Sequence, residues 1–458
     1  WARRCVLETG TLYMMTDNQR LKFEIVRTDS LNFHMGGSSG QDIPFYPIKL
    51  YLDDGKPNHN MIAAHVGLTG NAVNIPDAYK AEGFDFSGTK AFDEKTGYRS
   101  TSFLTVPLTN HLDEIIGVIQ LLNAHDPDTG EVIPFSEEAQ KLVESLCSQA
   151  AVAITNKQLI EQLEELFEAF IKLIATAIDK KSPYTGGHCT RVPVLTMMLA
   201  DAVENAQYGP YKDFSMTEEQ RYELYIAGWL HDCGKVATPT HVVDKGTKLE
   251  TIFDRIDTIN TRFEVLKRDA KIEYLQQLLD LKPSSNGEAK TLERQYQAKL
   301  REIRKNQKFI QACNIGGEYM AKALQDKVIE ISKYPYRQDG KKRSFLTHEE
   351  VRNLNIPKGT LLPEERQIIN DHIVITIDML NQLPYPKHLK NVPEFAGGHH
   401  EKLDGTGYPQ GLMHDEMSPQ AKIMAIADVY EALTAADRPY KDGKKLSLAM
   451  RILSLIHI

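Results

Sequence analysis

A regular apolar repeat in the first half of the chain constrains the fold most. Its positions alternate between spacings of four and three residues over residues 152–177, with Asn156 as a polar exception. This period predicts a helix whose apolar seam pairs with another helix, and a polar residue in such a seam can set its register. We expect a coiled-coil helix over residues 151–180 that forms a parallel homodimer. An amphipathic helix packed on its own chain is the alternative. The seam residues are Val152, Asn156, Leu159, Leu163, Leu166, Phe170, Leu173 and Ala177.

The segment before this helix, residues 1–150, has the pattern of a mixed α/β domain. Strand-like runs over residues 11–15 and 21–26 flank a polar turn, and a clearer pair over residues 102–108 and 115–122 flanks a polar loop. Such pairs are typical of hairpins. Ser136 is a candidate N-cap for the next helix, with Ala139 near its N3 position.

A charged helical stretch interrupts the second half of the chain. Two apolar seams lie on either side of a Pro/Ser/Asn/Gly turn at residues 283–287. We expect an antiparallel helical hairpin inserted over about residues 248–312, whose charges form a solvated face. The seam residues are Ile252, Ile256, Ile259, Phe263, Leu266 and Ala270, followed by Leu292, Tyr296, Leu300, Ile303 and Ile310.

Composition limits the classes of partner and the compartment. The 54 basic and 62 acidic residues give a net charge of −8, which argues against wholesale nucleic-acid binding. We find no apolar run long enough to span a bilayer and no leader segment, so we expect a cytoplasmic protein without a membrane partner. The five cysteines are scattered and odd in number, which favours reduced thiols over disulfides. Both ends look truncated, since residue 1 is Trp and the chain stops in an apolar run.

The residues that carry chemistry centre on His231 and Asp232. They follow the apolar helical run of residues 224–230, and an imidazole next to a carboxylate suits a divalent metal. Lys235 lies about one turn beyond His231, where its ammonium can bind a phosphate. Asp428 lies in an otherwise apolar helix, where an unpaired charge would be costly. Further candidate ligands are His188, His372, His399 and His400.

The first segment resembles a GAF domain. The resemblance rests on residues 10–13, 73–79, 92–100 and 116–123 and covers most of the segment, although much of the family's first helix is missing. It implies a sensor for an unknown small molecule. A GAF domain that has an empty pocket and serves only in dimerisation is the alternative.

The second half resembles an HD-GYP domain. The order H, HD, H, HH, D, together with Gly407-Tyr408-Pro409, is the pattern of that branch of the HD phosphohydrolases. The resemblance implies an all-helical domain over residues 181–458 that hydrolyses cyclic di-GMP with two divalent metal ions, Fe or Mn. It implies the metal ligands His188, His231, Asp232, His372, His399, His400 and Asp428, with Asp232 as the bridge. Substrate contacts would come from Lys235, Gly405, Thr406, Gly407, Tyr408, Arg438 and Lys441.

The chain departs from the family pattern in three respects. The hairpin separates His372 from Lys235, the family's C-terminal helices are missing, and Tyr184 stands where some members have the Glu that helps to hold a third metal. Because that Glu is missing, we expect two metals. The two resemblances together imply a multidomain fold with a helical linker, and hydrolysis to pGpG or further to GMP. An HD hydrolase of another cyclic dinucleotide or nucleotide is one alternative. A non-enzymatic module that binds cyclic di-GMP is another.

Overall fold

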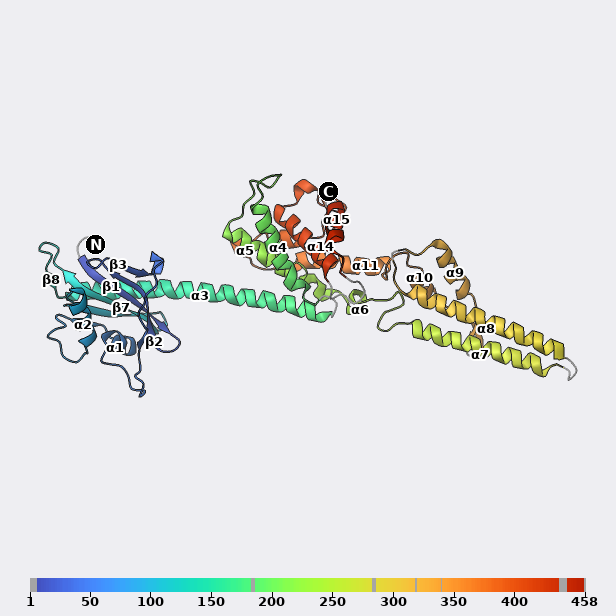
Figure 1. Cartoon of the computed structure of the whole chain (residues 1–458), viewed down its shortest axis with the longest axis horizontal. Helices are drawn as coiled ribbons and strands as arrows, with labels where there is room; N and C mark the ends of the chain where they lie inside the picture. Colours follow the sequence, from blue (N-terminus) through green and yellow to red (C-terminus); the bar gives the residue numbers. More distant parts are fainter. Residues whose placement is uncertain are drawn as a thin grey trace. The chain divides into compact units, whose positions relative to one another are not determined.

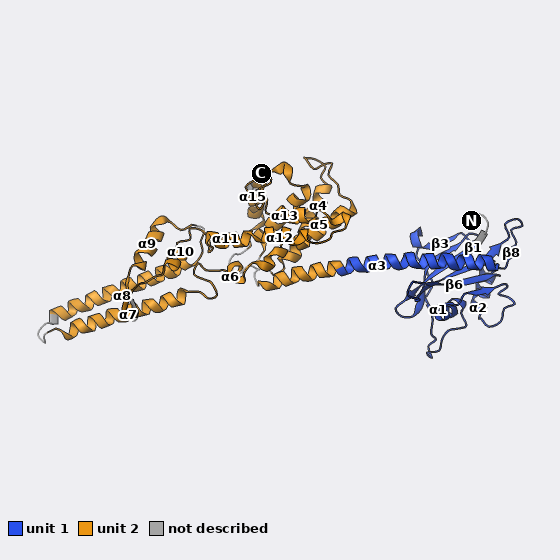
Figure 2. Cartoon of the chain, turned by 180° about the vertical axis from the view of Figure 1, so that it is seen from behind, with its two compact units in different colours: residues 1–166 blue, residues 167–458 orange. Residues whose placement is uncertain are grey.

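The chain folds into two compact units, residues 1–166 and 167–458 (Figure 2). The structure is a computed structural model that describes residues 6–182, 186–281, 286–317, 319–338, 340–435 and 443–456. The boundary between the units falls inside one long helix, α3 (Glu137–Lys181). The predicted coiled-coil segment is therefore part of a helix that begins well inside the first unit.

The first unit is an antiparallel sheet with helices on both faces. The strand order is β3-β2-β1-β7-β6-β5, with β4 paired to β2 and β8 paired to β7. Helix α1 (Ile62–Thr69) packs on one face, and the start of α3 packs on the other through Val143 and Cys147. Helix α2 spans Ser87–Thr96. The strands are β1 (Val6–Thr16), β2 (Arg20–Thr28), β3 (Phe33–Gly36), β4 (Ile48–Lys49), β5 (Val73–Ile75), β6 (Phe103–Thr109), β7 (Ile115–His125) and β8 (Val132–Ile133).

The local predictions for this unit are confirmed. Strands β1 and β2 form one antiparallel pair, and β6 and β7 form the other. The Ser136 hydroxyl accepts the Ala139 N–H at 3.1 Å, which makes Ser136 the N-cap of α3. Period-2 alternation and cap chemistry are local properties, so the sequence alone was enough to place these elements.

The seam residues of α3 lie on its exposed side. The exposed fraction is 66% for Leu163, 55% for Phe170 and 62% for Leu173. Ile171 and Ile178, on a different side of the helix, are buried in the core of the second unit. Within the described residues, the seam is therefore not packed on its own chain. This exposure disagrees with the alternative of an amphipathic helix that packs on its own chain. The homodimer itself stays a prediction.

The second unit has a helical core that carries the candidate metal ligands. Its apolar centre joins α3, α4, α5, α12, α13 and α14, and includes Leu224, Phe395 and Met424. The helices outside the insertion are α4 (His188–Glu204), α5 (Glu218–Leu230), α6 (Thr240–Val243), α11 (Pro363–Asn370), α12 (His372–Asn381), α13 (Val392–Gly397), α14 (Pro419–Thr434) and α15 (Leu446–Ile456). None of the described helices combines the length and the apolar character of a bilayer span.

The predicted helical hairpin is present, but it belongs to a larger insertion. Helices α7 (Ile256–Leu279) and α8 (Asn286–Asn314) lie side by side (Figure 1). Polar contacts join Asn260 to Gln307 and Glu273 to Lys299, so the helices run antiparallel. The prediction for Ile252 is wrong: it is 92% exposed and lies before α7 begins. The insertion also contains α9 (Lys322–Ser332), β9 (Pro335–Gln338) and β10 (Lys341–Ser344). Together with α10 (His348–Leu354), these elements complete a separate apolar core.

Candidate metal centre

Five separate segments of the second unit bring the predicted ligands together. His188 and His372 are the first residues of α4 and α12. His231 and Asp232 directly follow α5, and Asp428 lies within α14. His399 and His400 follow α13. Most of the ligands therefore lie at helix ends, and these ends meet at one point in the fold.

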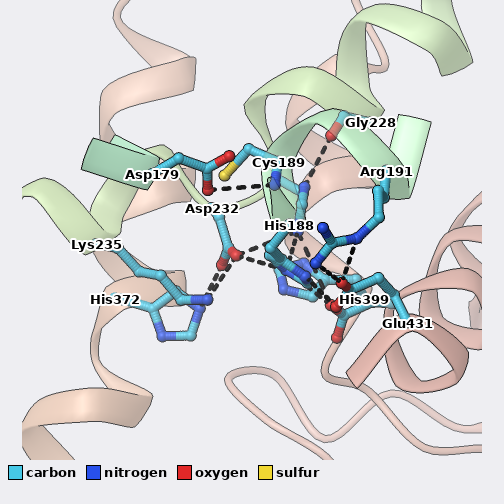
Figure 3. A network of polar contacts seen from close by, with 12 residues as sticks. Asp179, His188, Cys189, Arg191, Gly228, Asp232, Lys235, His372, His399 and Glu431 are labelled. Atoms are coloured by element: carbon cyan, nitrogen blue, oxygen red, sulfur yellow. Dashed lines mark hydrogen bonds and ion pairs between the residues drawn. The ribbon is translucent and has the colours of Figure 1, made fainter. Parts of the chain in front are cut away.

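Asp232 lies at the centre of this cluster (Figure 3). Its Oδ2 is 3.1 Å from His188 Nε2 and 3.2 Å from His231 Nε2. Its Oδ1 is 3.2 Å from His372 Nε2. Asp428 Oδ1 lies 3.2 Å from the same His188 nitrogen. The two oxygens of Asp232 thus face two different groups of ligands, as a bridging carboxylate would.

The histidine rings are oriented by their outer nitrogens. Nδ1 contacts the backbone carbonyl three residues earlier in His231 (2.8 Å), His372 (2.5 Å) and His399 (2.6 Å). A carbonyl oxygen can only accept, so Nδ1 carries the proton in each ring. The inward Nε2 is then left with a free lone pair, which is the form that binds a metal.

A carboxylate orients the fourth ring in the same way. His188 Nδ1 lies 2.6 Å from Glu431 Oε2, and Arg191 Nε lies 2.9 Å from Glu431 Oε1. Glu431 and Arg191 were not predicted from the sequence. The available indication was the spacing: Glu431 follows Asp428 by three residues on an apolar helix, so both side chains share the buried face.

The cluster fits metal ions better than it fits protons alone. The Nε2 atoms of His188 and His231 are 3.3 Å apart, and those of His372 and His400 are also 3.3 Å apart. Among the described residues, Asp232 Oδ1 is buried without a hydrogen-bond partner, and so is His399 Nε2. Buried polar atoms of this kind require a partner. Potential ligand atoms within 4.8 Å of one another come from three sets: His372, His399 and His400; His188, His231 and Asp428; and His231, Asp232 and His399.

The electrostatics of His399, His400 and Asp232 favour the protonation states that ligands need. Burial holds the pKa of His399 well below its usual range and lowers that of His400 to about 4. Burial alone would raise the pKa of Asp232, but Lys235 and the neighbouring histidines hold it well below its usual value. His188 differs: burial opposes its charged form, yet hydrogen bonds to three carboxylates raise its pKa. Neutral imidazoles beside ionised carboxylates are the metal-binding forms.

Gly234 allows α12 to approach the His-Asp pair. A Cβ at this position would lie 2.0 Å from the His372 carbonyl oxygen and 2.6 Å from the Thr376 nitrogen. The Gly234 N–H instead donates to the Thr376 hydroxyl at 2.9 Å. Next to it, Lys235 Nζ lies 2.5 Å from Asp232 Oδ2. Burial alone would lower the pKa of Lys235, but this carboxylate raises it. The close packing at Gly234 thus keeps His372 near Asp232, and the ion pair keeps Lys235 there.

The loop that contains the predicted substrate residues lies beside the cluster. Tyr408 stacks on His400 with ring centroids 4.9 Å apart. A Cβ at Gly407 would lie 2.3 Å from the Lys402 nitrogen, which explains the glycine. Both oxygens of Glu401 accept backbone N–H groups of residues 410 and 412, so this carboxylate holds the loop.

The remaining predicted residues are more peripheral. Gly405 has a φ of +72°, and the Thr406 hydroxyl donates to the exposed Asp404 at 2.7 Å. Arg438 and Lys441 lie outside the described residues, as does Tyr184. The structure therefore brings the seven candidate ligands, Lys235 and Tyr408 together, and the assignment of their roles stays a prediction.

Comparisons with known proteins match two segments of the chain to family models. Residues 7–154 match the family model of the GAF domain, and residues 348–456 match that of the HD domain. "3'3'-cGAMP-specific phosphodiesterase 3" of Vibrio cholerae is 38% identical over 95 residues, which cover 21% of this chain and 20% of that protein. "3'3'-cGAMP-specific phosphodiesterase 1" of the same organism is 50% identical over 62 residues, 14% of each chain. "Cyclic di-GMP phosphodiesterase" of Thermotoga maritima is 40% identical over 93 residues, 20% of this chain and 25% of that protein.

The chain thus combines a GAF domain with an HD domain, as the resemblance predicted. The match to the HD family begins at residue 348, just after the strands of the insertion, while His188 and His231 lie before the insertion. The matched segments cover a quarter or less of these relatives' length. HD-domain phosphohydrolases depend on metals, and the clustered His and Asp side chains agree with that.

Proposed function

We propose that the chain is a metal-dependent phosphodiesterase that hydrolyses cyclic di-GMP to pGpG or further to GMP. The observation that carries this proposal is Asp232, whose two oxygens face two groups of histidines in a buried cluster. Similarity to curated cyclic dinucleotide phosphodiesterases supports the reaction class. The GAF domain would sense a small molecule and regulate the activity through α3.

In this proposal two divalent ions, Fe or Mn, occupy the centre. One would be held by His188, His231 and Asp428 and the other by His372, His399 and His400, with Asp232 shared between them. When bound, such ions neutralise phosphate charge and lower the pKa of coordinated water. Three backbone carbonyls keep His231, His372 and His399 in the ligating form, and Glu431 orients the ring of His188.

The other residues would handle the substrate. Lys235 supplies a positive charge directly beside Asp232, where a bound phosphate would lie. Tyr408, with Gly405, Thr406 and Gly407, would form the side of the cleft that receives a guanine base. We assign Arg438 and Lys441 to phosphate contacts from their place in the sequence motif. We place the protein in the cytoplasm, because Cys147, Cys189, Cys233 and Cys313 are all free thiols.

A second candidate substrate is 3'3'-cGAMP. Two of the relatives named above are described as specific for it, and their identities to this chain, 38% and 50%, lie on either side of the 40% of the cyclic di-GMP enzyme. The two dinucleotides differ in one base, so the choice between them depends on the base side of the cleft rather than on the metal ligands.

A substrate comparison tests the proposal. Metal-loaded full-length protein is given cyclic di-GMP, 3'3'-cGAMP and a nucleoside monophosphate in separate assays, and kcat/KM is measured for each. We expect the highest kcat/KM for cyclic di-GMP. A higher value for 3'3'-cGAMP would reassign the substrate. Binding of cyclic di-GMP without any turnover would support the non-enzymatic alternative instead.

A further inference from the structure

Helix α8 has an outer face of a single charge sign. The helix carries seven basic and three acidic residues, and it buries Leu300, Ile303 and Ile310 against its neighbours. At about 100° per residue, six of the basic residues project from the side opposite Ile303 and Ile310, within a wedge of about 100°. These six residues form what we call the basic stripe: Lys290, Arg294, Arg301, Arg304, Lys305 and Lys308.

The basic stripe is exposed and unneutralised. All six side chains are exposed, and within the described part of the chain none of them makes an ion pair or a hydrogen bond to another side chain. The seventh cation of α8, Lys299, differs because it pairs with Glu273 at 2.6 Å. Glu302 lies outside the stripe and accepts a hydrogen bond from Tyr334.

An ordinary solvated face does not explain this pattern. The stripe contains three like-charge pairs at i, i+4, and such pairs destabilise a helix. They are Lys290 with Arg294, Arg301 with Lys305, and Arg304 with Lys308. The neighbouring helix α7, by contrast, mixes both signs on its outer face, with Asp257, Glu264 and Arg268. A dense anion along α8 would remove the repulsion between the stripe residues.

The chemistry of the face selects the class of partner. Within the described part of α8, no large apolar side chain is exposed, so the helix offers no apolar face to a membrane. Protein interfaces are depleted in lysine and have an apolar core, which the stripe lacks. Binding to the phosphate backbone of a nucleic acid requires only positively charged side chains. The stripe is about 27 Å long at 1.5 Å per residue, which equals about eight base pairs of duplex.

We propose that the basic stripe of α8 binds the phosphate backbone of a nucleic acid without reading its sequence. The net charge of −8 led to the opposite expectation, because it sums acidic residues from the whole chain. The local distribution of charge decides such binding, and here it is concentrated along one helix face.

The test uses full-length protein and a short fluorescent DNA duplex, with binding measured by anisotropy at several salt concentrations. Six phosphate contacts predict a slope of about −5 for log K against log salt. The variant R294Q/R301Q/K305Q/K308Q retains two of the six cations, so its slope should fall to about −2. Glutamine has a helix propensity close to that of lysine and arginine, and circular dichroism checks that the fold is retained.

A matched variant separates the effect of the basic stripe on binding from the effect of the protein's total charge. The variant K95Q/K358Q/K387Q/K390Q removes four exposed cations elsewhere, and its slope should equal that of the wild type. Equal loss of affinity in both variants would overturn the proposal. Absence of duplex binding at micromolar protein in low salt would also overturn it. So would tighter binding to polyglutamate or to anionic phospholipid vesicles, which would assign the stripe to a protein or a membrane.

Discussion

Asp232 is the residue on which the proposed chemistry depends. It is the only one of the seven predicted ligands with two oxygens directed at different histidine groups among the described contacts. Asp232→Ala should therefore lose bound metal and all turnover, because both groups lose their shared ligand. Inductively coupled plasma analysis and a turnover assay measure the two effects. Near wild-type activity in this variant would show that the site is wrongly assigned.

Lys235 should affect the rate rather than metal binding. Its ammonium contacts Asp232 but offers no ligand atom while it is charged, and the carboxylate raises its pKa. Lys235→Ala should keep the metal content and lower kcat by roughly 10²–10³-fold, as expected for loss of one charge near the reacting phosphate. Loss of metal from this variant would mean that Lys235 has a structural role instead.

Glu431 positions a ligand and should influence metal affinity. It accepts the Nδ1 proton of His188 and is itself held by Arg191. Glu431→Gln should weaken metal binding by roughly 10–100-fold, the range for partners of metal-bound histidines. Titration of metal-free protein measures this affinity. Glu219→Gln, which changes an exposed carboxylate on α5 in the same way, serves as the control; an equal loss of metal affinity in both variants would contradict a specific role.

The glycine at position 234, directly after the His-Asp-Cys segment, is required by the close approach of α12. Gly234→Ala would force α12 away, because the added Cβ meets the His372 backbone at 2.0 Å. We expect lower metal occupancy from displacement of His372, measured with the same titration. Gly287→Ala is the control, since nothing lies within 4 Å of a Cβ there. If both variants bind metal like the wild type, the close approach is not needed for the site.

At the scale of elements, periodicity predicted what is local and missed what depends on distant contacts. Both strand pairs, the N-cap of α3 and the antiparallel hairpin follow from alternation, cap chemistry and seam spacing. The elements from α9 to α10 were missed, because their apolar residues are buried only by packing on α7 and α8. Ile252 fits the seam spacing but precedes the helix, so no neighbour covers it.

The α3 helix should mediate dimerisation. Its seam exposes Leu163 and Phe170, which a second copy would bury. Leu163→Asp with Phe170→Asp should dissociate the dimer, since each buried carboxylate would be unpaired. Light scattering at micromolar protein measures the mass. Lys157→Asp with Gln158→Asp changes exposed residues of α3 outside the seam and should leave the dimer intact. A monomeric wild type would contradict the prediction.

At the scale of the whole molecule, the candidate site could be foreseen only by combining distant residues. His188 and Asp428 are far apart in the sequence, and each alone is more simply explained as a structural residue. Their order along the chain identified the cluster, while the distances, the Nδ1 partners and the role of Glu431 required the fold. The basic stripe was visible in the sequence, but only burial of the opposite face shows that all six cations share one side.

One measurement tests the central claim most directly: metal content and cyclic di-GMP hydrolysis in the same sample of full-length protein. The protein is loaded with Fe or Mn under reducing, anaerobic conditions and assayed beside Asp232→Ala. We predict about two metal ions per chain and conversion of cyclic di-GMP to pGpG, both lost in the variant. Wild-type protein with two bound metals that hydrolyses neither cyclic di-GMP nor 3'3'-cGAMP would contradict the account.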